Sequence, residues 1–120
     1  MLSASSEGPV EPDSDDLVSW LRERVLVMVR SQGRDLSLRQ LGVLLTIGEP
    51  GGPHTIKGVA EATGVEAPGV ARAADALEAY KLTRRLIGKD RRAARLEVTP
   101  SGRALVGALG TQLSAKMPVA

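Results

Sequence analysis

The stretch from Leu82 to Val98, LTRRLIGKDRRAARLEV, places the strongest constraint on the fold of this 120-residue chain. Its two ends, residues 82–87 and 94–98, predict short strands. The residues from Gly88 to Arg92 between them are nearly all turn formers or cations. The stretch therefore predicts a β-hairpin with a basic tip.

Positive charge is concentrated around this hairpin. Residues 81–103 contain eight Lys or Arg against two acids, a local net charge of +6, and those eight are half of the 16 basic residues in the chain. Residues 1–16 instead contain five acids and no base, so the rest of the chain has 16 bases against nine acids. An acidic tail thus precedes a basic domain. Such a domain would be attracted to polyanions, and this attraction would weaken as the salt concentration rises.

Length and composition exclude several classes of protein. A chain of this size forms one domain with a modest core. With no Phe, one Trp and one Tyr, it favours close-packed helices over a roomy aromatic-lined ligand pocket. The absence of Cys excludes disulfides, thiolate metal sites and thiol redox chemistry.

No group of residues predicts catalysis or a cofactor. The single histidine, His54, lies beside the Gly/Pro-rich segment 48–53 without a second His or a Cys, so no metal site is expected. That segment lacks the Gly-Lys-Ser/Thr ending of a phosphate-binding loop. No nucleophile with an acid-base partner is visible. We expect neither a catalytic residue nor a cofactor, and no enzymatic activity.

The first residues predict a disordered acidic tail over 1–14, followed by a folded domain over 15–120. The tail lacks the basic and apolar segments of a secretory signal, and no apolar run reaches the roughly 18 residues that span a bilayer. The expected location is the cytoplasm, in association with the nucleoid and not with a membrane.

Helical periodicity begins after the tail, over residues 15–32. Asp15 and Asp16 suit the positive end of a helix dipole. The run from Val25 to Val29 is apolar all round, which is unusual for a helix with only one face to bury. Either this segment crosses the core, or its second face contacts another subunit.

Three shorter helices follow. Ser37 is a good N-cap for a helix that ends at Ile47, and Thr55 caps another over 56–63 that Gly64 stops. The next helix, 67–80, has Pro68 in its first turn and an apolar side formed by Val70, Ala73, Ala74, Leu77 and Tyr80. A helix, a glycine-centred turn and a second helix over about 55–81 is the spacing of a helix-turn-helix.

A last helix is predicted over 101–116, after a turn or cap at Thr99 to Gly102. Its apolar stripe needs a partner surface, for which the helix at 15–32 is the obvious candidate within one subunit or between two. The complete order predicts a mainly α domain with a small β-hairpin wing at 82–98, a winged helix-turn-helix.

These segments resemble the MarR family of bacterial transcription regulators over about residues 37–109. The resemblance rests on the helix SLRQLGVLLTIGE, on Leu77-Glu78 near the end of the helix-turn-helix, on Asp90-Arg91-Arg92 and on the run from Leu96 to Gly102. It implies a homodimer whose terminal helices interlock, with helix 67–80 in the major groove of double-stranded DNA. Lys81 stands where the family commonly has glycine.

Candidate DNA contacts follow from the charges and from the resemblance. Arg72 is the one residue of helix 67–80 able to make a bidentate contact to guanine, and it serves a phosphate equally well. Arg84 and Arg85 point to opposite sides of a strand, so at most one would face DNA. The full set comprises Arg72, Arg84, Arg85, Lys89, Arg91, Arg92 and Arg95.

The expected dimer interface comprises Leu17, Trp20, Leu21, Leu105, Leu109 and Leu113. A small-molecule effector is compatible with the sequence but has no support in it. An alternative function is a winged-helix adaptor that binds protein in place of DNA, because Ala67, Pro68 and Gly69 supply no side-chain hydrogen bonds to bases.

Overall fold

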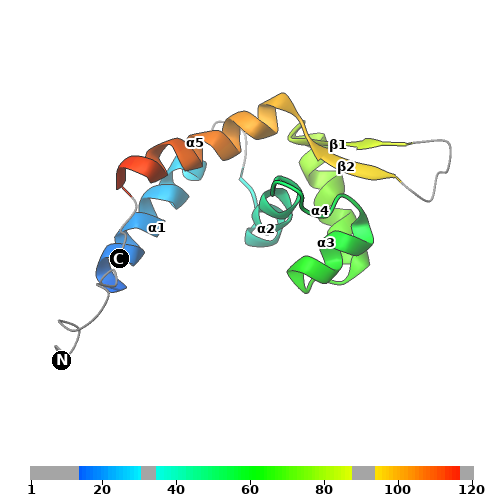
Figure 1. Ribbon diagram of the computed structural model, residues 1–120, viewed down its shortest axis with the longest axis horizontal. Helices are drawn as coiled ribbons and strands as arrows, with labels where there is room; N and C mark the ends of the chain where they lie inside the picture. The colour runs from blue at the N-terminus through cyan, green and yellow to red at the C-terminus, as the bar shows by residue number, and fades with distance from the viewer. Residues whose placement is uncertain (1–13, 31–34, 88–93, 117–120) are drawn as a thin grey trace.

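The computed structural model describes residues 14–30, 35–87 and 94–116, with side-chain detail as far as residue 110. Within these ranges the chain forms five helices and one two-stranded sheet (Figure 1). The elements are α1 Ser14–Val29, α2 Leu38–Ile47, α3 Ile56–Thr63, α4 Ala67–Ala79, β1 Thr83–Leu86, β2 Arg95–Val98 and α5 Pro100–Lys116. The predicted fold class, mainly helical with a small β-hairpin, is confirmed.

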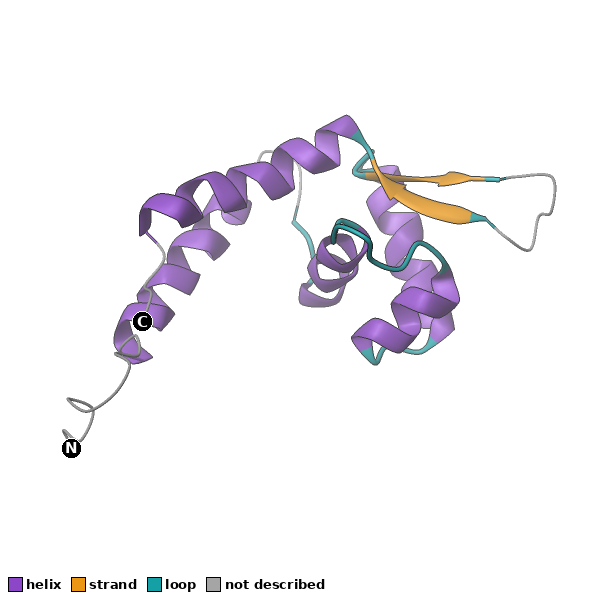
Figure 2. Cartoon of the chain, in the orientation of Figure 1, coloured by secondary structure: helices purple, strands orange, loops and turns teal. Residues whose placement is uncertain are grey.

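The elements are arranged as a body with an arm and a wing. Helices α2, α3 and α4 pack together as the body, while α1 and α5 lie side by side as an arm at one end (Figure 1). The antiparallel strands β1 and β2 project from the body on the side away from the arm (Figure 2). Because α5 follows β2 directly, it connects the wing to the arm.

The predicted helix ends in the body are confirmed. Ser37 Oγ accepts a hydrogen bond from Gln40 N at 3.0 Å, and Gln40 Oε1 accepts one from Ser37 N at 3.0 Å, which completes a capping box. Thr55 Oγ1 accepts from Gly58 N at the start of α3. Gly64 ends α3 in the left-handed conformation, with φ 76°. Local side chains therefore determine where α2 and α3 begin, and the left-handed conformation of Gly64 determines where α3 ends.

The core is aliphatic and lies between the body helices and the sheet. The predicted apolar side of α4 is confirmed, because Val70, Ala73, Ala74 and Leu77 are buried and Tyr80 packs against them. The largest fully buried side chains are Val43, Leu44, Val59, Val70, Leu77, Leu82 and Leu96. Helix α4 thus presents one side to the core and the opposite side to solvent.

The segment from Thr99 to Gly102 joins α5 to the body. Thr99 Oγ1 accepts a hydrogen bond from Gly102 N at 3.0 Å and donates one to Lys81 O at 2.6 Å. A Cβ at Gly102 would collide with the Leu82 carbonyl oxygen and would lie 2.6 Å from Val98 Cγ1. Thr99 therefore caps α5, and only glycine at position 102 lets α5 approach the chain at Leu82 this closely.

The turn after α4 is made by Lys81 itself. Lys81 has φ 63°, the one positive φ of a non-glycine residue in the described ranges. Its N–H donates to Glu78 O, and the following Leu82 N–H donates to Leu77 O. Lys81 thus adopts the left-handed conformation that a glycine would adopt more easily.

The apolar run in α1 does not cross the core. Met28 is buried, but Val25 and Val29 are 47% and 67% exposed. Leu17, Val18 and Leu21 on the same helix are also exposed. Of the two alternatives that the sequence left open, crossing the core is excluded, and the described part of the chain leaves an apolar face of α1 uncovered.

Candidate nucleic-acid interface

Helices α3 and α4, joined by the turn from Gly64 to Glu66, form the expected helix-turn-helix. The exposed side of α4 and its N-cap has four charged residues, Glu66, Arg72, Asp75 and Glu78. One cation against three carboxylates gives this surface a formal net charge of −2. Most of the attraction of the fold to a polyanion must therefore come from residues outside α4.

The wing is the obvious source of that attraction. In its antiparallel register Arg84 lies opposite Glu97, and Leu86 lies opposite Arg95. Arg84 Nε donates to Glu97 Oε1 across the strands, so this arginine is paired within the sheet. The pair is partly exposed, and exposed ion pairs contribute little stability.

Arg85 points to the other side of β1, as the alternation of a strand predicts. Its Nη2 lies 2.8 Å from Asp75 Oδ1 and 3.5 Å from Ala71 O, both on α4. This arginine therefore connects the wing to the exposed helix of the body. Arg84 and Arg85, predicted as DNA contacts, are both engaged with carboxylates of the same chain.

The other predicted cations differ in their surroundings. Arg72 and Arg95 are exposed, and in the described part of the chain neither forms an ion pair. Lys89, Arg91 and Arg92 lie outside the described residues. Arg72 and Arg95 are thus the two members of the set with free guanidinium groups in the described structure.

A third segment forms a backbone hydrogen bond to the two-stranded sheet. Leu96 N donates a hydrogen bond to His54 O at 2.6 Å, so the chain just before α3 pairs with β2. Sequence reasoning missed this contact, because the bond uses backbone atoms and leaves no side-chain pattern. It joins β2 to the start of the helix-turn-helix.

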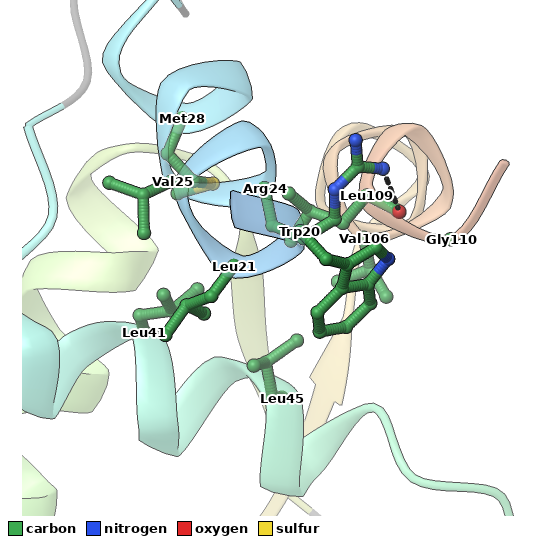
Figure 3. A pocket seen from close by; sticks show the side chains of 10 residues that line it. All are labelled: Trp20, Leu21, Arg24, Val25, Met28, Leu41, Leu45, Val106, Leu109 and Gly110. Carbon is green, nitrogen blue, oxygen red and sulfur yellow. Dashed lines mark hydrogen bonds between the residues drawn. The ribbon is translucent and has the colours of Figure 1, made fainter. Parts of the chain in front are cut away.

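Several residues predicted for the dimer interface lie at the arm. Trp20, Leu21 and Leu109 line an apolar pocket of about 370 Å³ between α1, α2 and α5 (Figure 3). Arg24 crosses this region, where its Nη1 donates to Leu109 O at 3.2 Å and its guanidinium lies 6.0 Å from the Trp20 ring centre. The composition predicted no roomy aromatic-lined pocket, and the lining of this pocket is mostly aliphatic, with Trp20 as its one aromatic residue.

Leu17 and Leu105 were also predicted for the dimer interface, but neither lines this pocket. Leu17 is 41% exposed on α1, whereas Leu105 is 5% exposed and belongs to the core of its own chain. Leu105 therefore packs within the subunit in this conformation. The Leu113 side chain lies beyond the residues described at side-chain level.

No three His, Asp or Glu residues come together in a group that could hold a metal ion, within residues 14–30, 35–87 and 94–116. Across the same ranges, no helix has the length and apolarity needed to cross a membrane.

A helix-turn-helix followed by a projecting β-hairpin defines a winged helix protein. No family model and no curated protein matches the sequence. Among solved structures, the transcriptional regulator PA3341 is 30% identical with a TM-score of 0.61, over 82% of this chain and 70% of its own. The S. aureus MepR–DNA complex is 21% identical with a TM-score of 0.64, over 85% and 79%.

A MarR family transcription regulator, SP03579, is 17% identical with a TM-score of 0.62, over 86% of this chain and 64% of its own. SP03579 and PA3341 are both described as transcription regulators. The chain therefore has a MarR-family winged helix fold, as the sequence motifs indicated.

Proposed function

We propose that the chain is a transcriptional regulator that binds double-stranded DNA as a homodimer. Helix α4 would enter the major groove, and the basic wing would contact the DNA backbone or the minor groove. The observation that carries the proposal is the position of an exposed α4 beside a hairpin that projects from the body (Figure 1). MepR, which shares the fold, has been solved as a DNA complex, and PA3341 is described as a transcriptional regulator.

The charge distribution indicates which residues would supply affinity for DNA and which would supply sequence specificity. The exposed side of α4 has a net charge of −2, whereas residues 81–103 have a net charge of +6. Phosphate contacts supply affinity without sequence information, and base contacts supply specificity. The chain should therefore obtain most of its affinity from wing cations, and select sequences mainly through DNA shape and a few contacts from α4.

The apolar face of α1 supports the dimer. Leu21, Val25 and Val29 are between 47% and 67% exposed, and they follow one another along the arm. Burying apolar surface is favourable by roughly 25 cal/mol per Å². A second copy whose α1 and α5 cover this face would remove it from water, and would place two copies of α4 on one duplex.

Titration of the protein against a mixed-sequence duplex over a series of salt concentrations tests the proposal. Binding should weaken linearly with the logarithm of salt, because each phosphate contact releases condensed counterions. Light scattering with and without the duplex should report a dimer bound to DNA. No binding well above micromolar protein at near-physiological salt would instead favour the adaptor function.

A further inference from the structure

A pocket of about 250 Å³ lies where α4 begins and faces α2. Its charged lining residues are Arg39 of α2, Glu66 and Arg72. A methyl group at the missing Cβ of Gly69 would lie 2.9 Å from Val65 Cγ1, 3.6 Å from Arg39 Nη1 and 4.0 Å from Arg72 Nη2. The guanidinium groups of two different helices therefore converge over one glycine.

Neither arginine is neutralised by a neighbour. In the ranges that the structure describes, Arg39 and Arg72 form no ion pair, and both are exposed. Glu66 lines the same pocket without pairing with either of them there. Two cations held close together repel each other, and an anion between them would relieve that repulsion.

The position of the Arg72 guanidinium also bears on its role. Its Nη2 lies over Gly69, one turn back along α4, and so turns toward α2. An arginine that recognises guanine must extend its guanidinium group to the base edge in the major groove and donate two hydrogen bonds there. The guanidinium group can equally donate two hydrogen bonds to the oxygens of a phosphate, and phosphates lie at the edges of the groove.

We propose that Arg39 and Arg72 together clamp one phosphate of the DNA backbone where α4 enters the groove. This inference rests on the proposed function and assigns Arg72 to the backbone, so Arg72 positions α4 and does not read a base. Arg39, which the sequence did not single out, acts as its partner. Gly69 is buried and lets Val65 pack closely against α4 at the floor of this pocket, because a Cβ there would lie 2.9 Å from Val65 Cγ1.

The test compares Arg39→Ala, Arg72→Ala and the double variant with the unaltered protein. Arg22→Ala is the matched control, because Arg22 lies on α1, is exposed, and its removal changes the net charge equally. Each variant is titrated against a panel of duplexes that differ in base sequence, at several salt concentrations. Thermal unfolding shows whether the fold is retained.

If the clamp exists, each single variant should weaken binding by a similar factor for every duplex in the panel. The double variant should lose less affinity than the product of the two single losses, because both arginines hold one phosphate. It should also lower the salt slope by about one unit, the value expected when one phosphate is no longer neutralised. Glu66→Gln should strengthen binding to every duplex, because it removes a carboxylate beside the phosphate.

Two results would overturn the clamp while leaving the DNA-binding function standing. One is a loss of affinity for Arg39→Ala no larger than that for Arg22→Ala. The other is an Arg72→Ala variant that changes the order of preference among the duplexes, as removal of a base-reading arginine would. If the unaltered protein binds no duplex even at low salt, the proposed function fails and the clamp fails with it.

Discussion

Arg85 Nη2 on β1 lies 2.8 Å from Asp75 Oδ1 on α4, so an ion pair joins the wing to the helix proposed to enter the major groove. Arg85 also approaches Ala71 O on the same helix. The pair links β1 to α4 and neutralises one of the carboxylates on the exposed side of α4. It therefore affects both the geometry and the charge of the proposed DNA surface.

Replacing this carboxylate should separate those two effects. Asp75→Asn should lower the free energy of unfolding by at most about 1 kcal/mol, because the Asp75 side chain is 64% exposed and solvent screens the pair. The same change should strengthen duplex binding, because it removes a negative charge and releases the Arg85 guanidinium. Urea unfolding and duplex titration measure the two quantities. Weaker duplex binding would show that the alignment of the wing matters more than its charge.

The close approach of α5 to Leu82 leads to a second prediction. Gly102→Ala should lower the free energy of unfolding by about 1–3 kcal/mol or more, because the new methyl group meets the Leu82 carbonyl oxygen and Val98 Cγ1. Backbone and a buried side chain have little room to move aside. Gly42→Ala in α2 is the control, since a Cβ there meets nothing within 4 Å and alanine favours a helix by about 1 kcal/mol. Equal free energies of unfolding of the two variants, measured by urea denaturation, would contradict the close approach of α5 to Leu82.

Lys81 allows a test of backbone strain. Lys81→Gly should raise the free energy of unfolding by up to about 1 kcal/mol, because the left-handed conformation at φ 63° costs a side chain about 1–2 kcal/mol. The greater freedom of glycine in the unfolded chain offsets part of that gain. Lys57→Gly, the same replacement inside α3, should instead lower stability by about 1 kcal/mol. A loss of stability at both positions would show that Lys81 is unstrained.

Features set by contiguous residues could be predicted from the sequence, whereas contacts between distant residues could not. Ser37, Thr55 and Gly64 mark helix ends through bonds to residues within four positions, so the helix order was predictable. The Arg85 to Asp75 pair, the bond from Leu96 N to His54 O and the convergence of Arg39 on Arg72 join separate elements. Each depends on how those elements pack, which no local pattern records.

The wing tip leads to a prediction of DNA affinity. Replacing Arg91 and Arg92 together by Ala should weaken duplex binding and lower its salt slope by roughly one unit for each phosphate that is no longer neutralised. Both residues lie outside the described part of the wing, so the prediction rests on the charge of the hairpin that β1 and β2 form. Arg22→Ala on α1 is the control for a loss of surface charge elsewhere. Unchanged binding at low and moderate salt would exclude the wing as a source of affinity.

The exposed apolar face of α1 leads to the last prediction, which concerns assembly. Leu21 is 55% exposed and lines the apolar pocket at the arm, so a second copy that covers this face would bury it. Leu21→Asp would place a carboxylate in that buried contact, where an unpaired charge is costly. The variant should therefore be monomeric in light scattering at concentrations at which the unaltered chain is a dimer.

The same variant should retain its fold and lose DNA affinity, because a monomer places only one α4 on the duplex. Ile87→Asp is the matched control for oligomeric state, since Ile87 is 66% exposed and directly follows the last residue of β1, a strand that projects away from the arm (Figure 1). It should remain dimeric. If Leu21→Asp also stays dimeric with an unchanged melting temperature, α1 is not the dimer interface, and its exposed apolar face requires a different partner.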